Sequence, residues 1–375
     1  MSRTLVVTND FPPKKGGIEN YVYELVKRFP PEEVVVFTSS ADGDRSFDAS
    51  LPFLVVRART RTLLPTPHIT AGAELLISQF DCDSVYFGAA APLALMTPRL
   101  RRVTAAKRFV ASTYGHECGW VKLAPGRAAI RRIGSAVDAL TLISDFTGPI
   151  IGAALTPEAR GRLVRLYPGV DPERYSSLPD PAPLRRGLDL EDRQVIVSLS
   201  RLVARKGQDT LIRTMPSVLT AVPGAALLIV GDGPYRPDLE RLAAQLGVSG
   251  AVRFAGRVPD EELPQYYAAG QVFALPTRTR LGGFDVEGLG IVFLEAAAAG
   301  LPVIVGDSGG APEAVRDGET GFQVSSTDVP GIAERLIELL SDPARAKAMG
   351  QAGRDWVRRD WTWEGPVETL RGLLR

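Results

Sequence analysis

The strongest constraint on the fold is a regular alternation between short apolar runs and longer stretches with helical periodicity. In the first half, the apolar runs cover 5–8, 34–38, 84–87, 109–113 and 139–143, and helical stretches at 18–29 and 71–79 lie between them. Strands that read as continuous apolar runs are buried on both faces, and strands separated by helices pair in parallel. The pattern therefore predicts an α/β protein built from β-α-β units.

The same alternation begins again after residue 190. Strands are expected at 195–200, 226–230, 252–255, 272–275 and 302–305, with helices at 209–219, 235–246, 288–299 and 330–340. A Pro-rich, aperiodic stretch at 167–183 separates the two halves and is typical of a linker. The 375 residues suit two domains. We expect a first domain over 1–170, a second over 171–355 and a terminal helix over 356–375. Trp361 and Trp363 either dock that helix on another surface or cover the end of the second core.

Composition excludes several classes of protein. The net charge is only +1, with two cysteines and two histidines. These counts exclude a disulfide framework, a Cys-rich zinc module and a His-rich metal centre, so no metal site is expected. The Asp81-Cys82-Asp83 sequence is predicted to be a turn rather than a metal site, because it lies at the amino end of a strand. Nucleic-acid binding is disfavoured, because no recognised module or aromatic platform accompanies the basic residues.

Charge is unevenly divided along the chain. Residues 1–170 hold 21 Lys and Arg against 15 Asp and Glu, a net charge of +6, whereas residues 171–375 carry −5. The basic clusters at 57–61, 99–108 and 127–132 are either solvated surfaces or docking sites for anionic lipid. No apolar run is long enough to span a bilayer, and the N-terminus runs directly into a strand, which predicts a cytoplasmic protein.

Three polar, Gly-containing segments are candidates for ligand binding. The first two follow predicted strands, at the sheet edge where open α/β sheets bind ligands, and the third lies where a helix is predicted to begin. The first contains Asn9, Asp10 and the Gly16-Gly17 pair that opens a helix, whose free amides suit an anion. It is neither a GxGxxG fingerprint nor a P-loop, so alone it is a weak signal, and an NAD-dependent oxidoreductase is disfavoured. In the second, Arg201 and Lys206 are placed to clamp a diphosphate.

The third segment runs from Glu287 to Glu295 through Gly288 and Gly290. Glycine amides at a helix start leave room for phosphate. On one continuous helix the two carboxylates would lie about 12 Å apart along the axis. That separation suits the two sugars of an extended nucleotide-sugar, and each carboxylate would accept hydrogen bonds from sugar hydroxyls. Glu295 lies in an apolar helix, where a carboxylate without a partner would be costly.

Together these motifs resemble a known enzyme family. The Arg201-to-Gly207 segment, the Gly231-Asp232-Gly233-Pro234 turn, the Glu-x7-Glu pair and the 309–313 segment resemble the retaining family 4 glycosyltransferases of GT-B fold. Narrower motifs resemble the actinobacterial phosphatidylinositol mannosyltransferases, in particular the phosphatidylinositol monomannoside mannosyltransferases, and they lie at Thr8–Ile18, Gly88–Pro92, Gly115–Trp120 and Asp285–Gly290.

The resemblance implies two Rossmann-like domains facing across a cleft, with a C-terminal helix crossing back to the first. It implies mannose transfer from GDP-mannose to the inositol ring of a phosphatidylinositol mannoside, at the inner face of the cell membrane. No tightly bound cofactor is implied, and any need for Mg²⁺ is left open. Arg201 and Lys206 would bind the diphosphate, Glu287 the hexose and Glu295 the ribose. The implied donor residues are Gly16, Gly17, Arg201, Lys206, Val258, Glu287, Gly288, Leu289, Gly290 and Glu295; Asn9, Asp10 and His116 would line the acceptor side.

One position departs from the family pattern. The family has a histidine near the donor sugar and phosphate where this chain has Tyr114, and a phenol with a pKa near 10 supplies no cation at neutral pH. Three interpretations follow. Tyr114 makes the hydrogen bond that the family histidine would make, and Tyr114 is then one of the catalytic residues. Alternatively, His116 takes the place of the family histidine, or the protein has a different donor, acceptor or level of activity. Two alternatives therefore stay open: a family 4 enzyme with another donor or a soluble acceptor, and an inactive protein that binds nucleotide-sugar.

Overall fold

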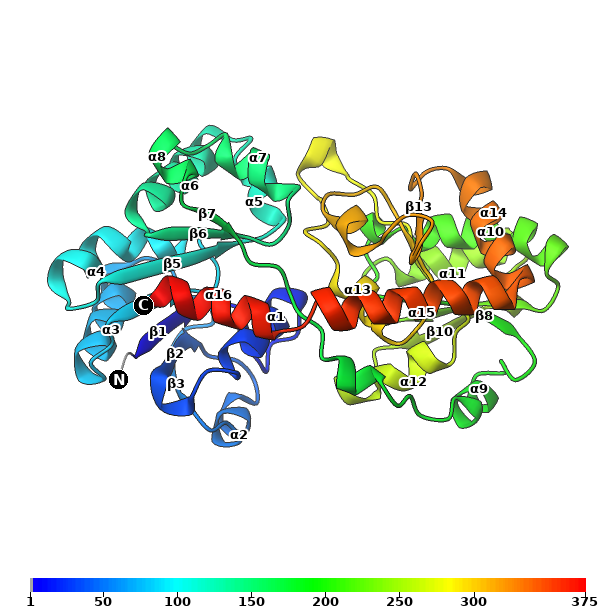
Figure 1. Cartoon of the computed structure of the whole chain (residues 1–375), viewed down its shortest axis with the longest axis horizontal. Helices are drawn as coiled ribbons and strands as arrows, with labels where there is room; N and C mark the ends of the chain where they lie inside the picture. Colours follow the sequence, from blue (N-terminus) through cyan, green and yellow to red (C-terminus); the bar gives the residue numbers. More distant parts are fainter. Residues whose placement is uncertain (1–2) are drawn as a thin grey trace. The chain divides into compact units, whose positions relative to one another are not determined.

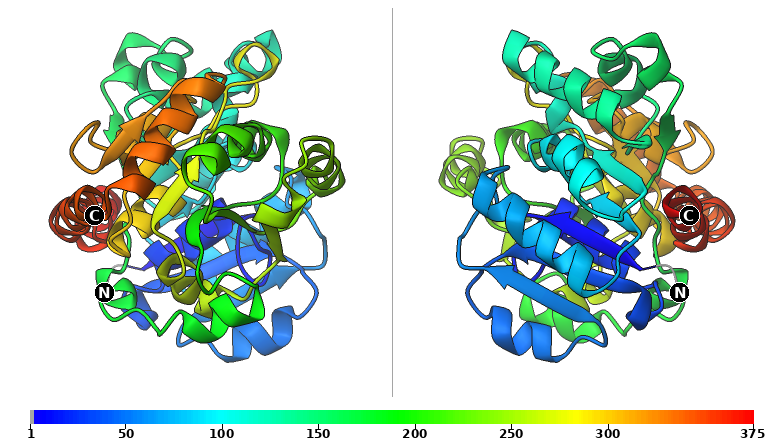
Figure 2. Two further views of the ribbon diagram at one scale, coloured as in Figure 1. Left: turned by 90° about the vertical axis from the view of Figure 1, so that its right-hand side faces the viewer. Right: turned by 90° about the vertical axis from the view of Figure 1, so that its left-hand side faces the viewer.

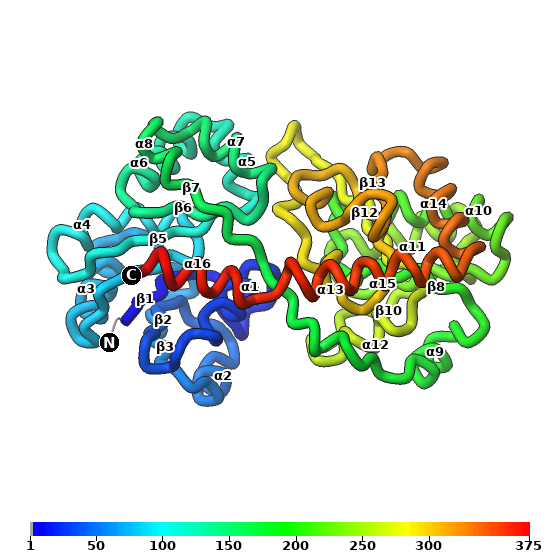
Figure 3. Tube along the Cα trace, in the orientation of Figure 1, coloured from blue at the N-terminus to red at the C-terminus, as the bar shows by residue number. Residues whose placement is uncertain are grey.

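The computed structural model describes residues 3–375, which divide into two compact units. The first unit is Met1–Pro168 together with Trp363–Arg375, and the second is Gly169–Thr362. The trace in Figure 3 shows the chain leaving the first unit after its last strand, and the terminal helix belonging to that unit again. The terminal segment predicted over 356–375 therefore starts too early, since only residues from Trp363 onward belong to the first unit.

Among the described residues, the first unit contains a seven-stranded sheet in the order β3-β2-β1-β4-β5-β6-β7, with every pairing parallel. Helices cover both faces of the sheet (Figures 1 and 2). Its strands are β1 (Thr4–Thr8), β2 (Val34–Ser39), β3 (Leu54–Ala58), β4 (Ser84–Phe87), β5 (Arg108–Thr113), β6 (Ala139–Leu142) and β7 (Leu163–Arg165). Its helices are α1 (Gly17–Val26), α2 (Asp44–Ala49), α3 (Pro67–Gln79), α4 (Thr97–Val103), α5 (His116–Trp120), α6 (Ala124–Ala136), α7 (Thr147–Gly152), α8 (Pro157–Arg160) and α16 (Glu364–Leu374).

The second unit has the same plan. Within the described residues 3–375 it contains a six-stranded parallel sheet in the order β10-β9-β8-β11-β12-β13. Its strands are β8 (Gln194–Leu199), β9 (Ala225–Val230), β10 (Val252–Gly256), β11 (Val272–Leu275), β12 (Val303–Val305) and β13 (Gly321–Gln323). Its helices are α9 (Ala182–Gly187), α10 (Gln208–Ala221), α11 (Arg236–Gln245), α12 (Leu263–Ala268), α13 (Ile291–Ala298), α14 (Val329–Ser341) and α15 (Pro343–Asp360). The predicted α/β class, with two Rossmann-like units, is confirmed.

Burial explains which strands the sequence revealed. All six residues of β2 and of β9 are buried. β9 is apolar throughout, and β2 begins with four apolar residues, so both strands stand out in the sequence. The edge strand β3 was not predicted, because its residues are half-buried and Leu54 is exposed, which breaks the run. Each unit has its own apolar core between sheet and helices. None of the helices within residues 3–375 is long and apolar enough to cross a membrane.

The two neighbouring tryptophans belong to different units. Trp361 packs edge-on against Trp356 at 5.6 Å between ring centroids, in the second unit. Trp363 packs on Tyr21 of α1 at 5.9 Å, under the guanidinium of Arg28. Helix α16 then buries its apolar side in the first unit, where it contacts β4 and β5. Both expectations for this Trp pair are therefore met, one by each residue.

The strand orders locate the functional edges of the two sheets. In each sheet the order reverses about the first strand of the unit, between β1 and β4 and between β8 and β11. Ligands of open α/β sheets bind outside the carboxyl ends of the strands at such a reversal. The segments that leave these ends are Asn9–Gly16, Gly88–Pro92, Ser200–Gly207 and the loop of residues 276–290.

Gly207 gives the first testable prediction, because it joins the basic loop after β8 to α10. Its φ is +78°, and a Cβ there would lie 2.0 Å from the carbonyl oxygen of Pro276. We expect Gly207→Ala to lower the thermal unfolding midpoint by more than about 5 °C, since left-handed strain and a backbone clash add. The control is Gly318→Ala, where φ is +76° but a Cβ meets no atom within 4 Å. Equal shifts in calorimetry would contradict the close-packing argument.

Candidate functional site

A compact ion cluster lies at the carboxyl edge of the second sheet. After β8, the 3-10 turn Ala204–Lys206 presents two neighbouring cations to Glu287. The Nζ of Lys206 lies 2.7 Å from Oε2 of Glu287, and a guanidinium nitrogen of Arg205 contacts the same oxygen. The Nε of Arg205 also lies 3.1 Å from Oδ1 of Asp285. Two cations and two carboxylates thus form a charge-balanced cluster.

The backbone of Glu287 is fixed from the loop after β12. Its amide donates to Oγ of Ser308 at 3.1 Å, and its carbonyl accepts from the amide of Gly310 at 3.0 Å. Gly309 fits against this backbone with φ +60°, because a Cβ would lie 2.0 Å from the carbonyl oxygen of Glu287. The glycine-rich segment after β12 therefore sets the position of Glu287.

The predicted helix over 288–299 is wrong at its start. Helix α13 begins at Ile291, after Gly290, whose φ of +91° cannot belong to a right-handed helix. Glu287 therefore precedes the helix that carries Glu295, and the 12 Å separation along one helix axis does not apply to this pair. Glycines favour such a break, because they are poor helix formers and adopt left-handed backbone without strain. The segment Gly288–Gly290 instead forms the turn that leads into α13.

Electrostatics keep Glu287 ionised. Burial alone would raise the pKa of Glu287, but Lys206 and Arg205 outweigh burial, so the pKa lies below its ordinary value. Burial lowers the pKa of Lys206, and the attraction of Glu287 only partly opposes this effect. Arg201, at the end of β8, is exposed and close enough to Lys206 to lower the pKa of Lys206 further. This loop can therefore present Arg201 and Lys206 to an anion.

Glu295 is buried in α13 apart from that cluster, and it has its own partner. The hydroxyl of Tyr267 donates to Oε2 of Glu295 at 2.9 Å. Burial raises the pKa of Glu295, and neither Tyr267 nor nearby Arg174 offsets this fully. Val258 lies half-buried in the loop that follows β10. The predicted contacts of these residues with ribose and base stay predictions.

The first unit brings two other predicted residues together. Asp10 follows β1 and His116 opens α5, and each shifts the pKa of the other. Burial raises the pKa of Asp10 to about 6, with a further contribution from Glu19. Burial lowers the pKa of His116, but Glu117, whose Oε1 lies 3.2 Å from its Nε2, and Asp10 together outweigh burial and raise it. Asp10 and His116 therefore lie close enough for each to stabilise the charged form of the other.

Tyr114 lies beside this pair but is buried. Its hydroxyl donates to the carbonyl of Gly88 at 2.6 Å, and its amide donates to Glu117 at 2.7 Å. Its ring stacks on His116 at 6.1 Å and meets Tyr21 edge-on at 5.7 Å. Burial raises the pKa of Tyr114 well above its ordinary value. The phenol is therefore a neutral packing platform for the imidazole.

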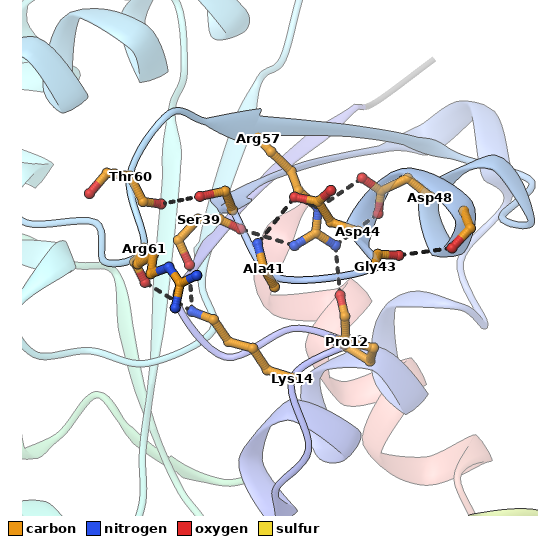
Figure 4. A network of polar contacts seen from close by, with 12 residues as sticks. Pro12, Lys14, Ser39, Ala41, Gly43, Asp44, Asp48, Arg57, Thr60 and Arg61 are labelled. Atoms are coloured by element: carbon orange, nitrogen blue, oxygen red, sulfur yellow. Dashed lines mark hydrogen bonds and ion pairs between the residues drawn. The ribbon is translucent and has the colours of Figure 1, made fainter.

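Asn9 has a structural role that the sequence did not reveal. Its side chain exchanges two hydrogen bonds with the backbone of Leu63, at 2.6 and 2.9 Å. Figure 4 shows the neighbouring network, in which Lys14 donates to Ser39 at 2.6 Å. Arg57 is only 9% exposed there and binds both oxygens of Asp48 at 2.8 Å. Arg57 is therefore an internal brace for the loop after β1 rather than a docking residue for anionic lipid.

Other predicted positions are resolved simply. Gly17 is the first residue of α1, and a Cβ there would meet no atom within 4 Å, so the helix start is open. Gly16 precedes it in extended backbone. Asp81 forms the predicted turn with φ +50°. The residues that the structure describes contain no group of three or more His, Cys, Asp or Glu placed to hold a metal ion.

Comparison with known proteins decides the family. The model described as Glycosyltransferase Family 4 matches residues 15–174, and that described as Glycosyl transferases group 1 matches 183–356. A GDP-mannose-dependent alpha-(1-6)-phosphatidylinositol monomannoside mannosyltransferase of Mycolicibacterium smegmatis is 48% identical, over 99% of this chain and 97% of that protein. The chain belongs to glycosyltransferase family 4. The monoacylated-acceptor mannosyltransferase of Corynebacterium glutamicum is 45% identical to this family 4 enzyme, over 100% and 98% of the two chains.

Solved structures confirm the GT-B fold of this family 4 glycosyltransferase. Anabaena Alr3699/HepE in complex with UDP-glucose aligns with a TM-score of 0.80 over 99% of both chains, at 20% identity. A glycosyltransferase from Rickettsia africae aligns with a TM-score of 0.82 over 100% and 98% of the two chains, at 17% identity.

Two residues of the candidate site were missed from the sequence. Arg205 was present among the cations after β8, but only Arg201 and Lys206 were selected. A charge pattern in the sequence could have indicated Arg205. Arg205 lies next to Lys206 in one loop and Asp285 lies near Glu287 in the other, and the two loops are joined by the ion pairs Arg205–Asp285 and Lys206–Glu287. Tyr267, the partner of Glu295, had no such signal.

The shifted pKa of Asp10 predicts a pH-dependent stability. A carboxyl whose folded pKa is about 6 disfavours the folded state once it ionises, so this penalty is complete above pH 6 and disappears as the pH falls toward 4. Asp10→Asn should therefore raise the thermal midpoint at pH 7.5, and the gain should shrink on acidification. Asp42→Asn is the control, because the Asp42 side chain is 92% exposed. A gain that is independent of pH would refute the assignment.

Proposed function

We propose that this enzyme transfers mannose from GDP-mannose to an inositol hydroxyl of a phosphatidylinositol mannoside. The observation that carries the proposal is full-length identity of 45–48% to GDP-mannose-dependent enzymes that use such acceptors. It is supported by the ion cluster at the carboxyl edge of the second sheet, which combines cations for a diphosphate with a carboxylate for sugar hydroxyls.

On the donor side, Arg201 and Lys206 are proposed to bind the diphosphate, with the amides of Gly288, Leu289 and Gly290 assisting. Glu287 would accept hydrogen bonds from the mannose hydroxyls, and Glu295 from the ribose. As the bond from the anomeric carbon to the diphosphate oxygen breaks, negative charge grows on the departing GDP. Fixed cations stabilise that charge more in this buried site than they would in water.

The proposed transfer retains the configuration at the anomeric carbon. The acceptor hydroxyl attacks from the face that GDP leaves and forms the new glycosidic bond. Its proton passes to the departing diphosphate oxygen, so no protein nucleophile is needed. Asp10 and His116 are proposed to hold the inositol hydroxyls, since they lie together at the carboxyl edge of the first sheet.

The lipid acceptor is proposed to be met at an anionic membrane surface on the inner face of the cell membrane. Of the three basic clusters, 127–132 suits this role, because Arg127, Arg131 and Arg132 are exposed on α6. Trp120 and Leu123 beside them are 40% and 54% exposed. An apolar edge next to cations suits the interface of an anionic bilayer. In the 99–108 cluster, by contrast, Arg99 and Arg101 are paired with acidic residues of the same unit.

The direct test incubates purified protein with labelled sugar nucleotides and with vesicles that contain a phosphatidylinositol mannoside. We expect labelled lipid from GDP-mannose, and none from UDP- or ADP-sugars or with free inositol as acceptor. Turnover of another donor without mannosylated lipid would overturn the proposal, as would comparable activity on a soluble polyol. GDP-mannose should also raise the thermal midpoint more than UDP-glucose does, because only bound ligand stabilises the fold.

A second candidate function, binding of nucleotide-sugar without turnover, is favoured only by Tyr114. Because the Tyr114 hydroxyl is committed to Gly88, we propose that His116 supplies the cation expected from the family histidine. Tyr114→His should then leave kcat/KM close to wild type, whereas His116→Gln should lower it by roughly 10²-fold. Binding of GDP without product in the wild type, and turnover gained in Tyr114→His, would instead identify an impaired enzyme.

A further inference from the structure

Arg205 occupies a position that the roles of Arg201, Lys206 and Glu287 leave unexplained. Its side chain is 20% exposed and bridges two carboxylates, those of Asp285 and Glu287. Its carbonyl also accepts from the amide of Arg278 at 2.8 Å, which ties the turn after β8 to the loop that carries both acids. Arg205 is therefore held at its backbone and at both ends of its guanidinium.

The two cations compete for one atom of Glu287. Lys206 and Arg205 both donate hydrogen bonds to Oε2 of Glu287. The other carboxylate oxygen, Oε1, is the one that we assign to a sugar hydroxyl. Lys206 has a second task in the proposed function, because it also binds the diphosphate. If it turned toward phosphate with no other cation present, a carboxylate that is only 10% exposed would lose its counterion, which is strongly unfavourable.

We propose that Arg205 is a positioning residue that keeps Glu287 neutralised and oriented while Lys206 is engaged by the donor diphosphate. Asp285 holds the guanidinium from the opposite side, so Arg205 does not follow Lys206 toward the phosphate. The two cations therefore have different roles. Lys206 binds the leaving diphosphate, and Arg205 orients Glu287 so that Oε1 faces the hexose. This inference rests on the proposed function, and it concerns recognition of the sugar rather than of the nucleotide.

The proposal predicts a selective defect in Arg205→Met. The ratio of the dissociation constant for GDP to that for GDP-mannose measures how much the hexose adds to the affinity. In Arg205→Met this ratio should fall toward one. The value of kcat/KM should drop by roughly 10- to 100-fold, the size expected for one hydrogen bond to a charged group. GDP affinity should change much less. Asp285→Asn should show the same selectivity with a smaller loss, and Arg205→Lys should recover part of it.

The matched control is Arg280→Met, which removes an exposed arginine from the loop that carries Asp285. Equal loss of GDP and GDP-mannose binding in Arg205→Met would make Arg205 a direct phosphate ligand and overturn the proposal. Unchanged kinetics would also overturn it, as would an equal defect in Arg280→Met. A fall in thermal midpoint alone, with the affinity ratio preserved, would leave only a structural role and would refute the inference.

Failure of the proposed function is distinguishable from failure of this inference. If the wild type forms no mannosylated lipid from GDP-mannose but turns over another sugar nucleotide, the donor assignment is wrong whatever Arg205 does. The comparison is then made with the sugar nucleotide that the wild type prefers and with its diphosphate. The ratio of their affinities must still collapse in Arg205→Met, or the positioning role is rejected.

Discussion

The proposed donor site depends on a buried carboxylate, Glu287, beside the residues that we propose to bind a more highly charged anion, the diphosphate. A sugar hydroxyl is well recognised by a carboxylate, but a diphosphate repels it. The protein resolves this conflict by surrounding Glu287 with more positive charge than it needs alone. The closeness of Arg205 has a cost, because burial lowers the pKa of Lys206 and the neighbouring charge of Arg205 lowers it further. The carboxylates of Asp285 and Glu287, together with the hydrogen bond from the amide of Arg278 to the carbonyl of Arg205, stabilise the two neighbouring cations.

Charged side chains also stabilise one another in the first unit. His116 lowers the pKa of Asp10, which burial has raised, and Asp10 raises the pKa of His116, which burial has lowered, so each favours the charged form of the other. Glu117 is wholly buried and divides its carboxylate between His116 and the amide of Tyr114. The start of α5 is thus shaped by one acidic side chain, and the phenol of Tyr114 completes the packing.

The sequence revealed the frame of the molecule because buried parallel strands are continuous apolar runs. It did not reveal β3, whose exposed Leu54 belongs to a sheet edge. It also misplaced the start of α13, because Gly290 has a left-handed φ of +91° and the helix begins only after it. The sequence also did not single out Arg205, for a related reason. Arg201 and Arg205 lie in the same loop, and the sequence does not show that the 3-10 turn Ala204–Lys206 leaves Arg201 exposed and places Arg205 against Glu287. The bond between Asn9 and Leu63 spans 54 residues and leaves no local pattern.

The division of the chain has a consequence for how the protein is made. The first unit is completed by residues 363–375, which emerge from the ribosome only after the entire second unit. Until Trp363 and α16 arrive, Tyr21 and the neighbouring strands present uncovered apolar surface. Domains generally fold as they are synthesised, so here the second unit can finish before the first. The first unit is therefore completed last, although it contains the residues that are synthesised first.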